Sequence, residues 1–278
     1  MKHFILLTGA SLLALAACET TTPPPVEPAE PPVATETPTP VATPTPAETP
    51  VAYDYSSALA SDLRTEEDLD KDEARLPAET LAFTGVEPGD AVLELEAGGG
   101  YFTSLLAAVV GDEGMVYMQN PQEFDSFWGG GDPPRLVGLP ETVSYLRTDF
   151  DDFSALPDES IDVVTWIMGP HELWYTPDGS DGLGEADPSF AEIARVLKSG
   201  GVLVMQDHKA PAGSPPTTGG DTHRIDPAII EGLATENGLV LTESSDLFAH
   251  PDDDLTMNVF APEVRGKTDQ FLVKYVKE

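Results

Sequence analysis

The sequence predicts an α/β fold: a doubly wound, mostly parallel seven-stranded sheet with helices on both faces. From about residue 75 onward, apolar runs of strand length alternate with segments of helical spacing. The run at 161–168 (IDVVTWIM) is almost continuously apolar, as in a parallel strand covered on both faces. The run at 91–95 passes through three consecutive glycines into a helical segment, a unit typical of such sheets.

The first 52 residues are expected to lie outside this fold. Residues 1–18 combine a positive start with a short apolar run, which is the pattern of a secretory signal rather than a membrane span. The segment ends Leu15-Ala16-Ala17-Cys18, which resembles the lipobox of bacterial lipoproteins and implies that Cys18 is lipidated. Residues 19–52 are rich in Pro and Thr and are expected to form a disordered tether. Residues 53–278 are left as one domain.

The cysteine content, the residue after Cys18 and the net charge limit where the protein is expected to reside and what it is expected to bind. Cys18 is the only cysteine, which suits an oxidising envelope compartment. The next residue is Glu19 rather than the aspartate associated with inner-membrane retention, so a periplasm-facing outer-membrane anchor is favoured. A formal net charge of −35 argues against nucleic acid and against an anionic membrane face. We expect a small-molecule substrate, with membrane contact only through the lipid on Cys18.

The elements of the domain follow from local patterns. A polar helix is expected at 53–74, and a short helix begins at Pro77 and ends before Gly85. The further expected elements are a helix at 102–110, strands at 115–119, 143–147 and 161–168, a helix at 188–198 capped by Ser199-Gly200-Gly201, a strand from 202, a helix at 228–237, and strands at 239–243 and 271–276.

The glycine turn is where a ligand is expected. A strand that enters a helix through glycines leaves backbone N–H groups free and places no Cβ in the way of a ligand. The glycine spacing does not fit the dinucleotide fingerprint. It is closer to the acidic-x-Gly-x-Gly-x-Gly pattern of class I S-adenosylmethionine (SAM) methyltransferases, on Glu94, Glu96, Gly98 and Gly100, with Glu96 in place of the first glycine.

Other segments between residues 75 and 277 strengthen this resemblance. They resemble the Rossmann-like class I SAM-dependent methyltransferases, and within them the bacterial set catalogued as predicted methyltransferases. The segments are RLPAETLAF (75–83), VLELEAGGGYFT (92–103), His171-x-x-Trp174, RVLKSGG (195–201), Asp207-His208, His223-Arg224-Ile225-Asp226 and Arg265-Gly266-Lys267-Thr268-Asp269.

The resemblance implies SAM as the cofactor. It places the ribose near the end of the second strand, where the class usually has an acidic residue and this chain has an amide. It places the adenine at the end of the third strand. The residues implied to bind the cofactor are Glu94, Glu96, Gly98, Gly99, Gly100, Gln119, Asn120, Asp149 and Phe150.

Histidines at the same sheet edge suggest the chemistry. His171 and His208 follow the expected fourth and fifth strands, and His223 lies in the next loop. A methyl acceptor loses a proton as it attacks a sulfonium, and neutral histidine accepts one near neutral pH. We expect His171, or else His208, to be the catalytic base. The acceptor pocket is expected to include Trp174, His223 and Arg224.

Two alternatives stay open. His171, Asp207, His208 and His223 carry side chains that bind divalent metals, but their spacing matches no compact metal motif, so no metal ligand is assigned. The other alternative is a lipid-anchored domain that keeps the fold without binding SAM. It is favoured by Glu96, by the missing carboxylate after the second strand, and by the lipobox, which places the domain outside the cytosol.

Overall fold

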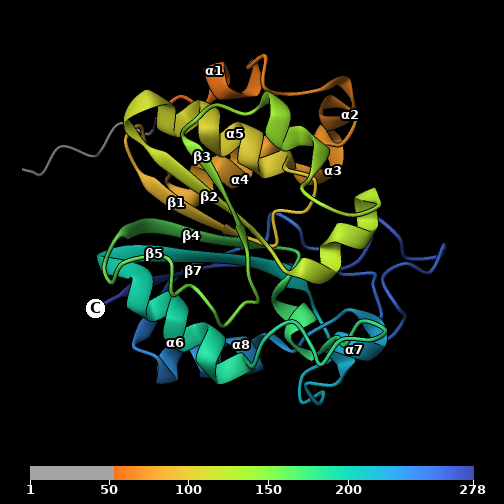
Figure 1. The fold of residues 1–278 in the computed structure, drawn as a ribbon. Coiled ribbons are helices and arrows are strands. Elements are labelled where there is room, and N and C mark those ends of the chain that lie inside the picture. The colour runs from red at the N-terminus through yellow and green to blue at the C-terminus, as the bar shows by residue number, and fades with distance from the viewer. Residues whose placement is uncertain (1–52) are drawn as a thin grey trace, which may run out of the picture. The chain divides into compact units, whose positions relative to one another are not determined.

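The computed structural model describes residues 53–278, and these form the predicted seven-stranded sheet (Figure 1). The strand order is β3-β2-β1-β4-β5-β7-β6. Strands β1 to β5 pair in parallel, and β7 runs antiparallel to both β5 and β6. The strands are β1 Ala91–Leu95, β2 Met115–Asn120, β3 Val143–Arg147, β4 Ile161–Ile167, β5 Leu197–His208, β6 Leu239–Ser245 and β7 Gln270–Lys277. The predicted signal segment, Cys18 and the tether lie outside the described residues.

Helices cover both faces of the sheet, with α1, α4 and α5 on one side and α6 and α8 on the other (Figure 1). None of the helices within residues 53–278 is long and apolar enough to cross a membrane. The α-helices are α1 Ser56–Leu59, α2 Glu66–Leu69, α3 Asp72–Arg75, α4 Pro77–Thr84, α5 Tyr101–Val110, α6 Ala186–Val196, α7 Thr218–Thr222 and α8 Pro227–Glu236. The 3-10 helices are η1 Gly111–Glu113, η2 Gln122–Trp128, η3 Pro134–Gly138 and η4 Pro170–Trp174.

Each face of the sheet has its own apolar core, because side chains alternate along every strand. Val92 of β1 packs with Leu105 of α5 in one core. Leu93 and Leu95, its neighbours on the strand, belong to the other core with Ile193 of α6. All three β1 side chains are fully buried or nearly so, as expected for a central parallel strand.

The predicted helix at 53–74 is wrong, since three short helices occupy this segment. Thr65 interrupts it by capping α2: its hydroxyl accepts a hydrogen bond from the N–H of Asp68, whose carboxylate accepts one from the Thr65 N–H. Leu76 then ends α3 in the left-handed conformation, with φ 43°. Local capping therefore overrides helical spacing here.

The predicted cap at Ser199-Gly200-Gly201 is also wrong. The helix α6 ends at Val196, and β5 begins at once with Leu197. Leu197 pairs with Ile161 and Val202 pairs with Val163, so the residues between 197 and 202 bulge out of the ladder. Glycine serves this bulge because Gly200 has φ 80°, a conformation that L residues disfavour.

The carboxyl ends of β1, β4 and β5 meet at one edge of the sheet, which is the edge where ligands bind in open α/β folds. Parallel pairing sets Leu95 beside Trp166, and Ile167 beside Gln206. The glycine turn, η4 and the segment after His208 all start from this edge. Residues distant in the sequence are thereby brought together.

Candidate active site at the carboxyl edge of the sheet

The turn after β1 has the backbone that its glycines predict. Gly98 and Gly100 have φ values of 56° and 82°, which favour glycine. A Cβ added at Gly98 or at Gly99 would meet nothing within 4 Å, so the space above these residues is open. Among the described residues no acceptor takes the N–H of Gly99, and the first N–H groups of α5 lack helical partners. The turn is an open cradle for a polar ligand.

Glu96 stands at the first-glycine position of this turn and keeps the left-handed backbone, with φ 54°. Its Oε2 lies 3.3 Å from the indole Nε1 of Trp166, and a Cβ on Gly169 would overlap it. Burial, followed by the charge of Glu172, raises the pKa of the Glu96 carboxyl well above its usual value. The Glu96 carboxyl therefore occupies the space beside Trp166 and Gly169, where burial favours its protonated form.

The amide side chains at the end of β2 form hydrogen bonds with backbone groups in and beside the turn. Asn120 donates to the Gly98 carbonyl at 3.1 Å and accepts from the Gly98 N–H at 2.7 Å. Gln119 accepts from the Glu96 N–H at 3.0 Å and donates to the Thr148 carbonyl at 2.6 Å. Both side chains are fully buried. They hold the turn in shape, and this corrects the expectation that they contact the ligand directly.

Glu94 has the same bracing role. Its carboxylate accepts a hydrogen bond of 2.6 Å from Thr103 in the first turn of α5. Burial raises the pKa of Glu94 to about 8, against the lowering effect of that hydrogen bond. Glu94 therefore ties β1 to α5 and does not face the open space above the turn.

Asp149 and Phe150, which follow β3 and are predicted to lie near the adenine, have different surroundings. Phe150 is fully buried, its ring lies 4.8 Å from that of Trp166, and its N–H donates to the Leu183 carbonyl at 2.9 Å. Phe150 thus belongs to the core, which corrects its expected contact with an adenine. Asp149 is exposed, and no described residue bonds its carboxylate. The open turn and the exposed Asp149 carboxylate are therefore the parts of the predicted cofactor site that are free to contact a ligand.

His171 and His223 approach each other beside a pair of carboxylates. His171 Nδ1 lies 2.7 Å from Asp207 Oδ1, and His171 Nε2 lies 3.1 Å from His223 Nδ1. Glu172 Oε1 lies 3.3 Å from His171 Nε2 and 3.3 Å from His223 Nδ1. Burial acts to lower the pKa of His171, but Asp207 outweighs it and raises the pKa to about 10. With both ring nitrogens engaged, His171 is poorly placed to act as a free base.

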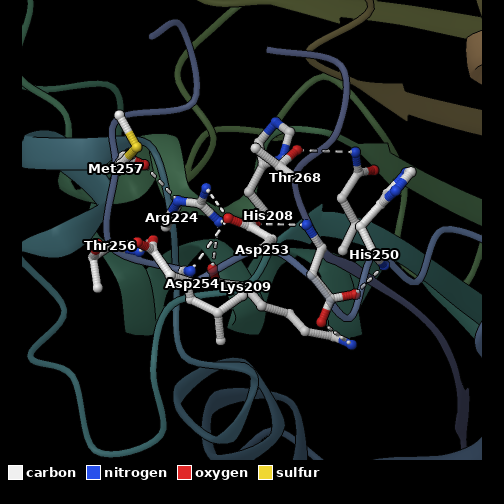
Figure 2. Close-up of polar contacts among 12 residues, drawn as sticks. His208, Lys209, Arg224, His250, Asp253, Asp254, Thr256, Met257 and Thr268 are labelled. Carbon is white, nitrogen blue, oxygen red and sulfur yellow. Dashed lines mark hydrogen bonds and ion pairs between the residues drawn. The ribbon is translucent and has the colours of Figure 1, made fainter. Parts of the chain in front are cut away.

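Of the three histidines predicted at the sheet edge, His208 is the one that lines a cleft. Its Nδ1 lies 2.7 Å from the hydroxyl of Thr268 on the segment before β7 (Figure 2). Burial lowers the pKa of His208 to about 4, so the ring is neutral at physiological pH. No described residue bonds Nε2, and His208 lines a cleft of about 500 Å³. The geometry therefore favours His208 over His171 as a proton acceptor.

The cleft combines an apolar wall with several cationic side chains. Phe102 from the first turn of α5 lines it, together with Met168 after β4, so it begins beside the glycine turn. Met168 has φ 69°, the kind of backbone strain that gathers at functional sites. The other side chains that define its chemistry are Lys71, Arg75, Ile167, Phe248, His250, Val259, Phe260 and Arg265.

Arg224 does not reach this cleft, which corrects its expected place in an acceptor pocket. It is fully buried and forms an ion pair with Asp253, at 2.8 Å from Nη1 and 3.2 Å from Nη2. It also donates to the carbonyls of Met257 and Lys209, at 2.7 and 3.0 Å (Figure 2). Arg224 therefore fixes the loop around residues 253–257 against the end of β5.

Trp174 and His223 also lie outside the lining of the cleft. Trp174 is packed against α7, because a Cβ on Gly219 would lie 3.1 Å from its Cβ. Sequence reasoning missed two polar groups of the site: Glu172, adjacent to His171, and Thr268, inside a segment already noted for its resemblance. A carboxylate next to a predicted site histidine was the available signal for Glu172.

Comparisons with known proteins show what the chain is similar to. The family described as a methyltransferase domain matches residues 93–205. A ubiquinone/menaquinone biosynthesis C-methyltransferase of Teredinibacter turnerae is 30% identical over 135 residues, which are 49% of either chain. The corresponding protein of Erwinia tasmaniensis is 25% identical over 184 residues, 66% of this chain and 68% of that one. The chain thus spans about half the length of the first of these curated relatives.

Solved structures share the fold. A SAM-dependent methyltransferase from Aquifex aeolicus superposes with a TM-score of 0.54 at 20% identity, covering 81% of this chain and all of that one. A geranyl diphosphate C-methyltransferase from Streptomyces coelicolor, in complex with S-adenosyl-L-homocysteine, gives 0.53 at 16% identity and covers 80% and 89%.

Residues 93–205 are therefore similar to a methyltransferase domain, and the chain shares the fold of known SAM-dependent methyltransferases. The domain match and these neighbours support S-adenosylmethionine as the cofactor.

Proposed function

We propose that this domain transfers a methyl group from SAM to a small-molecule acceptor bound in the cleft beside the glycine turn. The single observation that carries the proposal is the position of His208, whose ring lines that cleft, bonds Thr268 through Nδ1 and leaves Nε2 without a partner among the described residues. When bound, SAM supplies an electrophilic methyl group on a sulfonium. The open space over Gly98 and Gly99, with exposed Asp149 at the end of β3, would hold it.

The chain's own part is to bind the acceptor and take its proton. His208 Nε2 accepts the proton of the attacking group when Nδ1 carries the ring hydrogen toward Thr268. The hydrogen bond to Thr268 fixes the orientation of the ring, as the third member of a catalytic relay does. Burial is the main cause of the low pKa of His208, and the nearby charges of His171, Arg224 and His223 lower that pKa further against the opposing effect of Asp207.

The cleft indicates the acceptor's chemistry. The whole chain has 14 basic residues against 49 acidic ones, yet Lys71, Arg75 and Arg265 all line this cleft. The apolar part of the wall includes Phe102, Phe248 and other side chains. An acceptor with an anionic group and an apolar body complements both features. The resemblance to the bacterial set of predicted methyltransferases adds no named acceptor.

His208→Asn is expected to lower kcat by about 100- to 10,000-fold, the usual contribution of a general base, while the affinity for S-adenosylhomocysteine stays within twofold. Asparagine keeps a polar group near Thr268 but offers no basic nitrogen. The assay follows labelled methyl from SAM into a panel of hydroxylated aromatic and alkyl carboxylic acids and phosphates. An unchanged kcat in this variant would remove His208 from the reaction.

We also propose that the protein is an envelope lipoprotein, anchored through Cys18 and favouring the outer membrane. The support is the lipobox Leu15-Ala16-Ala17-Cys18 after an apolar run, with Glu19 next in the sequence and a Pro/Thr-rich tether at 19–52 before the domain at 53–278. One acyl chain alone binds membranes weakly, so stable anchoring needs the several chains of a mature lipoprotein.

Full-length protein expressed in a Gram-negative host should incorporate labelled palmitate and sediment with the outer membrane in a density gradient. Cys18→Ser should abolish the labelling, because no other cysteine can carry the lipid. Label that persists in the Cys18→Ser protein, or none in the unaltered chain, would contradict the anchor.

A further inference from the structure

Three side chains next to the cleft take no part in the proposed methyl transfer. His171 Nε2 and His223 Nδ1 are 3.1 Å apart, and Glu172 Oε1 lies 3.3 Å from each. His171 and Glu172 belong to η4, whereas His223 follows α7. We propose that these three residues, called the His-Glu-His cluster below, bind a divalent transition metal ion of the zinc type. The proposal holds whether or not the domain transfers methyl groups.

The dimensions of the cluster suit such an ion. Tetrahedral zinc with bonds of about 2.0–2.1 Å places neighbouring ligand atoms about 3.4 Å apart. The three observed separations of 3.1, 3.3 and 3.3 Å match one face of that tetrahedron to within a few tenths of an ångström. Two imidazole nitrogens and one carboxylate oxygen are zinc ligands, whereas calcium and magnesium prefer oxygen alone. Three protein ligands also leave a fourth position for water or a substrate.

Asp207 supports the cluster in the way that outer carboxylates support metal-binding histidines. Its Oδ1 lies 2.7 Å from His171 Nδ1, and its Oδ2 accepts the backbone N–H of His171 at 2.6 Å. Asp207 is fully buried at the end of β5. With a metal bound, this arrangement would keep the hydrogen on Nδ1, and Nε2 would give up its proton to the solvent and coordinate the ion.

A buried acceptor without a partner points to the same ligand independently. Glu172 Oε2 is buried and has no hydrogen-bond partner among residues 53–278. Buried carboxylate oxygens that lack any partner are rare in folded proteins, and a bound ion is one way in which proteins satisfy them. A cation at the cluster would compensate the charge of this carboxylate.

His223 is held in place from both sides. It has φ 54°, a strained backbone for a non-glycine residue, and its ring lies 4.9 Å from Phe260 and 5.3 Å from Tyr175. Phe260 also lines the cleft. A metal in the cluster would therefore lie one side chain away from the proposed acceptor.

The test is a calorimetric titration of zinc chloride into the full chain, prepared without an affinity tag and stripped with a chelator. We expect one equivalent to bind with a Kd of micromolar or below. Glu172→Gln and His223→Ala should each weaken binding at least 100-fold, and Asp207→Asn should weaken it about 10- to 100-fold, the usual effect of losing an outer-shell carboxylate. Far-UV circular dichroism confirms that each variant is folded.

His250→Ala is the matched control, because His250 is an exposed histidine outside the cluster. It should leave the zinc affinity unchanged. Cobalt(II) should give the intense visible bands of a tetrahedral site, and these should disappear in Glu172→Gln. Zinc binding that fails to saturate near one equivalent, or that is the same in Glu172→Gln and His223→Ala as in the unaltered chain, would overturn the proposal. Binding of S-adenosylhomocysteine is measured separately, so the two proposals fail independently.

Discussion

Asp253→Ala is expected to destabilise the domain by about 3–5 kcal/mol, the usual cost of leaving one member of a buried ion pair without its partner. Both side chains of the Arg224–Asp253 pair are fully buried. Asp253 also accepts the backbone N–H of Asp269 at 2.7 Å and that of Leu255 at 3.2 Å. Removal of the Asp253 carboxylate would therefore leave the Arg224 guanidinium and the backbone N–H groups of Asp269 and Leu255 without this hydrogen-bond partner.

Urea denaturation of the full chain measures this loss as a fall in the midpoint at constant slope. Glu67→Ala is the matched control, since the Glu67–Lys71 pair is exposed to solvent and should contribute little to stability. Arg224→Met combined with Asp253→Leu should recover much of the stability, because apolar replacement of a buried pair is often tolerated. Equal losses of stability in Asp253→Ala and Glu67→Ala would show that the buried ion pair contributes no more than the exposed one.

Gly98→Val is expected to weaken the binding of S-adenosylhomocysteine at least 100-fold. A valine side chain would stand in the open space over the turn, where a Cβ meets nothing within 4 Å. The left-handed backbone adds a strain of about 1–2 kcal/mol, which a domain of this size tolerates.

Gly238→Val separates the two effects of that substitution. Gly238 has φ 77° and equally open surroundings, but it lies in the turn between α8 and β6, away from the site. The Gly238→Val protein should carry a similar strain and keep its affinity, as measured by calorimetry. Equal affinities for Gly98→Val and Gly238→Val would disprove the placement of the cofactor over the turn.

The sheet was predictable because its signals are local. The apolar run of β4 and the strand–glycine–helix unit of β1 and α5 each identify an element without knowledge of its neighbours. The errors came from competing local interactions. Thr65 caps a short helix inside a helical pattern, and the glycines after α6 form a bulge where a helix cap was expected.

The sequence predicted that the site lies at the carboxyl edge of the sheet, but it did not predict the role of each side chain there. Parallel topology brings His171 and His208 to one edge, as expected, because His208 ends β5 and His171 lies just after β4. Partners at long range decide what each side chain then does. Asp207 hydrogen-bonds His171, Asp253 forms an ion pair with Arg224, and the Gly98 N–H donates to Asn120. The spacing of these residues in the sequence does not predict any of these contacts. The role of a polar residue depends on such contacts more than on its motif.

Calorimetric titration of SAM into the full chain, in the presence of a chelator, tests the central claim most directly. We expect saturable binding near one equivalent with a micromolar Kd and no need for metal, because the proposed cofactor site consists of the turn and Asp149 alone. Absence of binding heat up to millimolar SAM would contradict it, and would favour a domain that keeps this fold without the cofactor.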